Sequence, residues 1–352
     1  MSELKRIEDL IGDIHSLNQD AIDAASAHLD SLTKPPGSLG KLEDISKQLA
    51  GIMGEVIPDV SHKAIVVMAA DHGVCEEGVS AFPQEVTPQM VLNFLEGGAA
   101  VNVLARHAGA EVVCVDIGVN ADLEHEALVA RKVRYGTANM AQGPAMTREE
   151  AIRAILVGTE VVDELVARGV RILATGEMGI GNTTASSALL HVLGGVDLEA
   201  GVGRGTGIDD ARWRHKQEVI RRSIQMNRPD DQDPIDVLAK VGGLEIAGLT
   251  GVILGAAKHS CAVVIDGFIS SAAALIAARL APVSVQYMIG SHQSHEQGHA
   301  RMLEAVGLKP MLHMDMRLGE GTGAALCFTL IDAAGKIMRE MASFESAGVS
   351  RG

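Results

Sequence analysis

The sequence has few aromatic residues, which make up 2% of its 352 residues, whereas apolar residues make up 47%. The core therefore has to be built from aliphatic side chains. Long uninterrupted apolar runs are also missing. The most apolar stretch, 243–257, contains Glu245 and several glycines, which favours a buried helix over a membrane span. The first twenty residues contain no apolar segment of signal-peptide length, so we expect a soluble, cytoplasmic protein.

Cysteine and net positive charge are scarce too. The four cysteines are widely spaced and form no CxxC pair, which is typical of reduced core thiols rather than of a disulfide framework or a zinc site. The formal net charge is −15, which argues against general binding to nucleic acid or to anionic membranes. A phosphorylated small molecule remains compatible with this charge, because backbone N–H groups, a helix N-terminus and one or two local cations can hold a phosphate.

The pattern of apolar residues predicts an α/β fold. After residue 61, short β-branched runs each end in a loop with glycine or aspartate, and most are followed by a helical stretch. The runs are KAIVVMAA, EVVCV, VRILAT, CAVVI, VSVQYMI and PMLHM. Continuous apolar strands with intervening helices predict a mostly parallel, Rossmann-like sheet with helices on both faces.

The two ends of the chain predict a second, smaller unit. Residues 1–60 have helical spacing, interrupted by the KPPGSLG stretch, and residues 321–352 contain a long helix with an apolar stripe. We expect these segments to form a small helical subdomain beside an α/β catalytic domain of residues 61–320. In parallel sheets, ligands bind beyond the carboxyl ends of the strands. The polar and glycine-rich loops follow those ends, which indicates an enzyme.

The strongest motif is LATGEMGIGNTTASSALL, which joins a predicted strand to a helix. Gly176, Gly179 and Gly181 let the backbone approach a ligand closely, and Asn182 or Thr183 can cap a helix whose N-terminus favours an anion. The GxxGxG spacing differs from both the P-loop and the dinucleotide fingerprint. The motif predicts a phosphate site, and the alternative is a simple tight turn.

Two further glycine-rich loops carry charged residues. GVGRGTGIDD, residues 201–210, contains Arg204 and is followed by Lys216, and both are candidate phosphate partners unless the loop is only a flexible turn. RLGEGTGAAL places Glu320 between two glycines in apolar surroundings that would raise its pKa. A general base requires such a carboxyl group, although most loop glutamates are simply solvated.

Two other segments have open interpretations. His295 to His299 matches the HExxH zinc-protease pattern, but Gly298 interrupts the helix that this pattern needs, so a polar loop at the mouth of the site is the better interpretation. The Asp71-His72 pair fits either a catalytic or metal dyad or a structural histidine at a strand end. Residues 77–90 fit either the wall of an aromatic-substrate pocket or a loop.

Taken together, the motifs resemble the nicotinate-nucleotide–dimethylbenzimidazole phosphoribosyltransferase family of cobalamin nucleotide-loop assembly. The matching stretches cover almost the whole chain, and those at 175–184 and 317–325 are the most specific. They are KPPGSLG, AADHGV, TGEMGIGNTT, GRGTG, SHQSHEQGH and RLGEGTGAA.

The resemblance implies transfer of the phosphoribosyl group of nicotinate mononucleotide to 5,6-dimethylbenzimidazole, with inversion at C1, by a homodimer without metal or cofactor. It implies that Glu320 is the general base and that the role of Glu177 is open. The implied substrate-binding residues are Ser80, Gln89, Glu177, Met178, Gly179, Gly181, Asn182, Thr183, Gly203, Arg204, Gly205, Lys216 and Leu318. A non-catalytic nucleotide-binding module and, less well supported by the glycine spacing, a dehydrogenase are the alternatives.

Overall fold

The computed structural model describes residues 2–205 and 207–350, so Thr206 of the GRGTG motif lies outside the described part. Six parallel strands form the central sheet, in the spatial order β3-β2-β1-β4-β5-β6. Their bounds are Lys63–Ala70 (β1), Glu111–Gly118 (β2), Val129–Ala130 (β3), Ile172–Met178 (β4), Ala262–Ile265 (β5) and Met288–Gly290 (β6). The predicted α/β fold with a mostly parallel sheet is confirmed.

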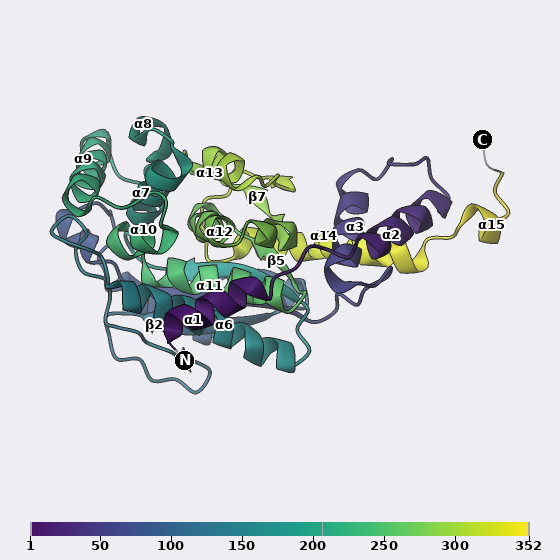
Figure 1. Ribbon diagram of the computed structural model, residues 1–352, viewed down its shortest axis with the longest axis horizontal. Coiled ribbons are helices and arrows are strands. Elements are labelled where there is room, and N and C mark those ends of the chain that lie inside the picture. The colour runs from purple at the N-terminus through teal and green to yellow at the C-terminus, as the bar shows by residue number, and fades with distance from the viewer. Residues whose placement is uncertain (1, 206, 351–352) are drawn as a thin grey trace.

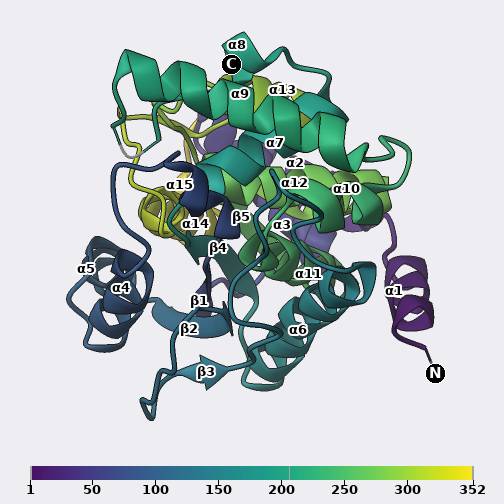
Figure 2. The ribbon, with the colours of Figure 1, turned by 90° about the vertical axis from the view of Figure 1, so that its left-hand side faces the viewer.

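Helices cover both faces of this sheet (Figure 2). On one face lie α6 (Arg148–Ala167) and α11 (Leu244–Lys258), and a Cβ on Gly251 of α11 would lie only 1.8 Å from the carbonyl oxygen of Ile155 in α6. This crossing therefore requires glycine. The other face carries α4 (Val86–Leu95), α5 (Ala100–His107) and α14 (Thr322–Glu340).

The apolar stretch 243–257 forms α11, which is buried along nearly its whole length, as predicted. Among the described residues, no helix combines the length and apolar character needed to cross a bilayer. The four cysteines are free thiols, and three of them are buried: Cys114, Cys261 and Cys327.

Two predicted strands differ from the structure. Most of VSVQYMI lies in a 3-10 helix, η2 (Pro282–Tyr287), because Pro282 favours a helical start. Only its last two residues enter β6. PMLHM contributes β8 (Leu312–His313), which pairs with β7 (His292–Gln293) in a separate two-stranded sheet. The sixth strand of the main sheet is instead β3. With two residues, this strand is too short to be recognised from a pattern of apolar residues.

Figure 1 shows a further group of helices on the side of the molecule above α11. They follow β4, β5 and the β6–β7 segment, and so surround the carboxyl end of the sheet. Their bounds are Asn182–Gly194 (α7), Leu198–Gly201 (α8), Asp210–Asn227 (α9), Pro234–Val241 (α10), Phe268–Leu280 (α12) and His299–Val306 (α13).

A small helical bundle extends away from this body (Figure 1). It contains α2 (Gln19–Ser31), α3 (Lys41–Met53) and the C-terminal part of α14, with α15 (Phe344–Ala347) beyond it. Its own apolar cluster is formed by Ala25, Leu29, Leu32, Ala50 and Met338. The first helix, α1 (Glu3–Gly12), packs instead on α6 and α11. The division of the chain into residues 1–60, 61–320 and 321–352 stays a prediction. Within it, α1 contacts helices of the 61–320 part.

Candidate active site

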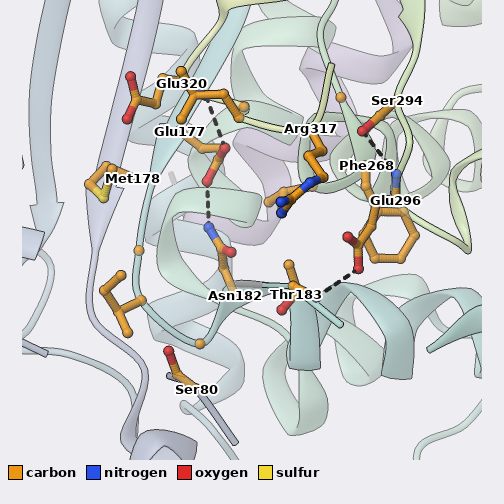
Figure 3. Close-up of a pocket in the computed structure, with 18 of the residues that line it drawn as sticks. Ser80, Glu177, Met178, Asn182, Thr183, Phe268, Ser294, Glu296, Arg317 and Glu320 are labelled. Carbon is orange, nitrogen blue, oxygen red and sulfur yellow. Dashed lines mark hydrogen bonds between the residues drawn. The ribbon is translucent and has the colours of Figure 1, made fainter. Parts of the chain in front are cut away.

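A cavity of about 390 Å³ opens at the carboxyl end of the sheet, beside the ends of β4 and β5 (Figure 3). Ten of the residues implied by the family resemblance line it. They are Ser80, Glu177, Met178, Gly179, Gly181, Asn182, Thr183, Gly205, Leu318 and Glu320. The sheet therefore brings together segments that are more than two hundred residues apart in the sequence.

Four other predicted residues do not line this cavity, and the fourth, Lys216, is described below. Gln89 is exposed on α4. Arg204 forms an ion pair with Asp210, the first residue of α9. Gly203 packs against Glu296, whose carboxylate leaves no room for a side chain at this position.

Glu320 owes its position to an unusual backbone. Its φ is 64°, between Gly319 at 81° and Gly321 at 94°, so three successive residues adopt the left-handed region that favours glycine. The side chain is buried, with 5% of the residue exposed. Burial raises the pKa of Glu320 to about 7, and the nearby negative charge of Asp266 adds to the increase.

Asp266 and Glu177 hold the Glu320 loop in place. The two carboxylate oxygens of Asp266 accept the N–H groups of Gly321 at 3.1 Å and Ala324 at 3.0 Å, and so stabilise the N-terminus of α14. Glu177 accepts the N–H of Glu320 at 3.2 Å. Burial raises the pKa of Glu177 to about 8, opposed by this hydrogen bond and reinforced by the charges of nearby carboxylates.

The start of α7 faces the cavity. Its N-cap is Gly181, with φ of 96°, where a Cβ would lie 2.6 Å from the sulfur of Cys75. Neither Asn182 nor Thr183 caps the helix through its side chain, contrary to our prediction. Asn182 is the first residue of the helix rather than its N-cap, and its side-chain amide instead donates to Glu177 in β4 (Figure 3). The helix dipole still favours an anion here.

Lys216 does not line the cavity but contacts one of its lining residues, Thr183. It is buried in α9, and its ammonium group donates to the Thr183 hydroxyl at 2.7 Å. Burial lowers the pKa of Lys216 to about 8, while the carboxylate of Glu296 opposes this decrease. At neutral pH the group is still mainly charged, so it adds positive potential beneath Thr183.

The family model described as phosphoribosyltransferase, DBI_PRT, matches residues 14–349. The chain belongs to this family. It is 58% identical over 341 residues to the nicotinate-nucleotide–dimethylbenzimidazole phosphoribosyltransferase of Chloroflexus aggregans, with 97% of both chains covered. It is 55% identical over 348 residues to the enzyme of the same name from Desulforamulus reducens, covering 98% of this chain and 99% of the relative.

A solved structure agrees with these sequence matches. The crystal structure of the nicotinate-nucleotide–dimethylbenzimidazole phosphoribosyltransferase of Thermus thermophilus aligns with a TM-score of 0.90 at 47% identity, covering 96% of this chain and 100% of the other. The family resemblance predicted from the motifs is confirmed, and the protein is a phosphoribosyltransferase.

The phosphoribosyltransferase cavity also contains residues that the sequence analysis missed. The most informative are Phe268, Ser294, Glu296 and Arg317. Glu296 accepts the N–H of Gly205 at 3.2 Å. Their positions in the sequence could have indicated two of these residues. Glu296 lies in the zinc-like motif at the predicted mouth of the site, and Arg317 lies three residues before Glu320.

The HExxH segment of the phosphoribosyltransferase forms a loop that leads into a helix. α13 begins only at His299, so His295 is not on it. His299 is buried, where its ring accepts the N–H of Ser294 at 2.7 Å and contacts the hydroxyl of Ser271 at 3.0 Å. Within residues 2–205 and 207–350, no group of three or more His, Cys, Asp or Glu side chains is arranged to hold a metal ion.

His72 does not line the cavity. It follows β1, just before η1 (Gly73–Glu77), and its ring is 2.6 Å from the carboxylate of Glu245 in α11. Both side chains are buried. A Cβ on Gly179 would lie 3.3 Å from each of them. The pair therefore packs against the backbone at Gly179, which favours the structural interpretation of Asp71-His72 over a catalytic or metal dyad.

Proposed function

We propose that this phosphoribosyltransferase transfers the phosphoribosyl group of nicotinate mononucleotide to 5,6-dimethylbenzimidazole. The products are nicotinate and α-ribazole 5′-phosphate, formed with inversion at C1 and with Glu320 as general base. One observation carries the proposal: a buried carboxyl group with a pKa of about 7 shares a cavity with the N-terminus of α7. The printed names of the relatives support the substrates.

The chemistry needs one carboxylate. As the C1–N bond of nicotinate mononucleotide breaks, its electron pair neutralises the pyridinium nitrogen, so the leaving ring needs no acid. An unprotonated nitrogen of dimethylbenzimidazole attacks C1 from the opposite face, and the positive charge that develops is removed when the other ring nitrogen gives its proton to Glu320. A base whose pKa is near the working pH is best suited to this transfer.

The cavity residues divide between the two substrates in this proposal. The 5′-phosphate binds at Gly179, Gly181 and the start of α7, with Lys216 acting through Thr183. Met178, Leu318 and Ser80 contact the benzimidazole ring. Related bases stay predicted as alternative acceptors, since the chain as a whole has few aromatic residues. Assembly as a homodimer stays a prediction, which the molar mass in solution would test.

The proposed reaction is tested by following both products. The enzyme is incubated with β-nicotinate mononucleotide and dimethylbenzimidazole, free nicotinate is quantified, and the configuration of the ribazole phosphate is determined by NMR. We expect nicotinate and the α-anomer in equal amounts. A β-anomer would contradict inversion, and no nicotinate would contradict the proposed substrates.

Lys216→Met should weaken the binding of the phosphorylated substrate. The substitution keeps the buried volume but removes the charge, so we expect KM for nicotinate mononucleotide to rise about tenfold or more, the factor for a lost hydrogen bond to a charged group. The value of kcat should change less, because the phosphate does not react. Steady-state kinetics at saturating dimethylbenzimidazole measures both, with the exposed Lys336→Met as control. An unchanged KM would exclude Lys216 from the phosphate site.

A further inference from the structure

The cavity has two sides of different chemistry (Figure 3). One side carries Glu320, Met178 and Ser80. The other carries Phe268, the first residue of α12, together with Arg317. Because the proposed reaction inverts C1, the entering and leaving rings must lie on opposite faces of the ribose. If the benzimidazole lies beside Glu320, the leaving ring lies beside Phe268 and Arg317.

Arg317 is the one cation among the described residues that line the cavity, which also include Glu177, Glu296 and Glu320. Two of these carboxylates accept hydrogen bonds from the backbone: Glu177 from the N–H of Glu320, and Glu296 from the N–H of Gly205. The guanidinium group of Arg317, in contrast, forms no hydrogen bond or ion pair with any residue in the described part of the chain. A cation in this position is available for an anionic ligand.

The backbone that carries Arg317 is held in place. The N–H of His295 donates to the carbonyl oxygen of the preceding residue, Met316, at 2.8 Å, and β8 pairs with β7 a few residues earlier. Arg317 also lies three residues from Glu320 in the same loop. Its side chain can therefore adapt to a ligand while its Cα stays fixed relative to the proposed base.

We propose that Arg317 and Phe268 form the subsite for the leaving ring. Arg317 pairs with the ring carboxylate, and Phe268 packs against the apolar edge of the ring. The inference rests on the proposed function, in which the substrate carries two anionic groups. The phosphate binds at α7 and Lys216, which leaves the ring carboxylate for Arg317. The subsite thus selects a pyridine carboxylate and disfavours its neutral amide, because a guanidinium binds a carboxylate through two charge-assisted hydrogen bonds.

Arg317→Gln tests this selectivity. The ratio of kcat/KM for nicotinate mononucleotide to that for nicotinamide mononucleotide is measured in both proteins. We expect the substitution to lower the first value about tenfold or more and to leave the second within about threefold, so that the preference decreases by about tenfold. Arg317→Lys should retain part of the preference. The exposed Arg301→Gln, whose side chain pairs only with Glu304 among the described residues, is the matched control.

Binding of the free rings separates this inference from the proposed function. Calorimetry with nicotinate and with nicotinamide needs no transfer step, and we expect the wild type, but not Arg317→Gln, to bind nicotinate about tenfold tighter than nicotinamide. An unchanged preference in Arg317→Gln, or an equal loss for both ligands, would overturn the subsite. Absence of nicotinate release by the wild type would overturn only the proposed reaction. Because Arg317 is exposed, an unchanged Tm should verify that the variant folds.

Discussion

Glu320→Gln is expected to slow ribazole phosphate formation at saturating substrates by about a hundredfold or more. Glutamine has nearly the same shape as glutamate but cannot accept the proton that the benzimidazole must lose, and a positioned general base contributes about 10²–10⁴-fold. The rate is measured from nicotinate release under saturating concentrations of both substrates. The exposed Glu304→Gln on α13, whose carboxylate pairs with Arg301 and does not line the cavity, serves as the control.

The pH dependence of kcat/KM provides a second test of Glu320 as the general base. Because burial raises the pKa of Glu320 to about 7, the carboxyl group is protonated and inactive as a base below this pH. We therefore expect kcat/KM of the wild type to rise as the pH increases through about 7, and this rise to be absent in Glu320→Gln. A loss of less than about tenfold, or a variant that keeps the same pH dependence, would contradict the role of Glu320.

His72→Ala should destabilise the protein by about 3–5 kcal/mol, the usual effect of removing one partner of a buried ion pair. The substitution leaves Glu245 buried without its partner, and the second carboxylate oxygen of Glu245 already has no hydrogen-bond partner in the described part of the chain. Urea-induced unfolding, followed by circular dichroism, measures the change in the free energy of unfolding.

A matched pair nearer the surface provides the control. His259 and Asp163 lie 2.5 Å apart, but both side chains are partly exposed, so His259→Ala should cost no more than about 1 kcal/mol. Replacing both His72 and Glu245 by leucine should recover much of the loss, because no unpaired charge remains. If His72→Ala and His259→Ala cost the same, the buried pair does not stabilise the fold as inferred.

The sequence predicted the elements whose signals are local. The run KAIVVMAA coincides with β1 because a strand covered on both faces is apolar at every position. The helical spacing expected on the C-terminal side of the KPPGSLG stretch is found in α3. The position of Glu320 in the cavity wall could also be predicted, since glycines on both sides of a glutamate after a strand-like run indicate an unusual backbone conformation.

Features that depend on tertiary contacts could not be predicted from the sequence. Asn182 or Thr183 was expected to cap α7, but the actual partner of Asn182, Glu177, is identified only once the bend between β4 and α7 is known. Arg317 and Phe268 are 49 positions apart in the sequence and meet only because the segment after β8 returns to the end of β5. The role that the family resemblance implies for Gln89 stays a prediction, since its side chain is exposed on α4 and does not line the cavity.

The left-handed backbone of Glu320 has a consequence for engineering. Only four described residues other than glycine have a positive φ, and Glu320 is one of them. Such a conformation costs about 1–2 kcal/mol for an L-residue with a side chain, so Glu320→Gly would relieve strain in a loop already shaped for glycine. A variant library screened for heat resistance alone would therefore favour loss of the proposed base. Thermostabilisation of this enzyme should be screened for turnover in the same round.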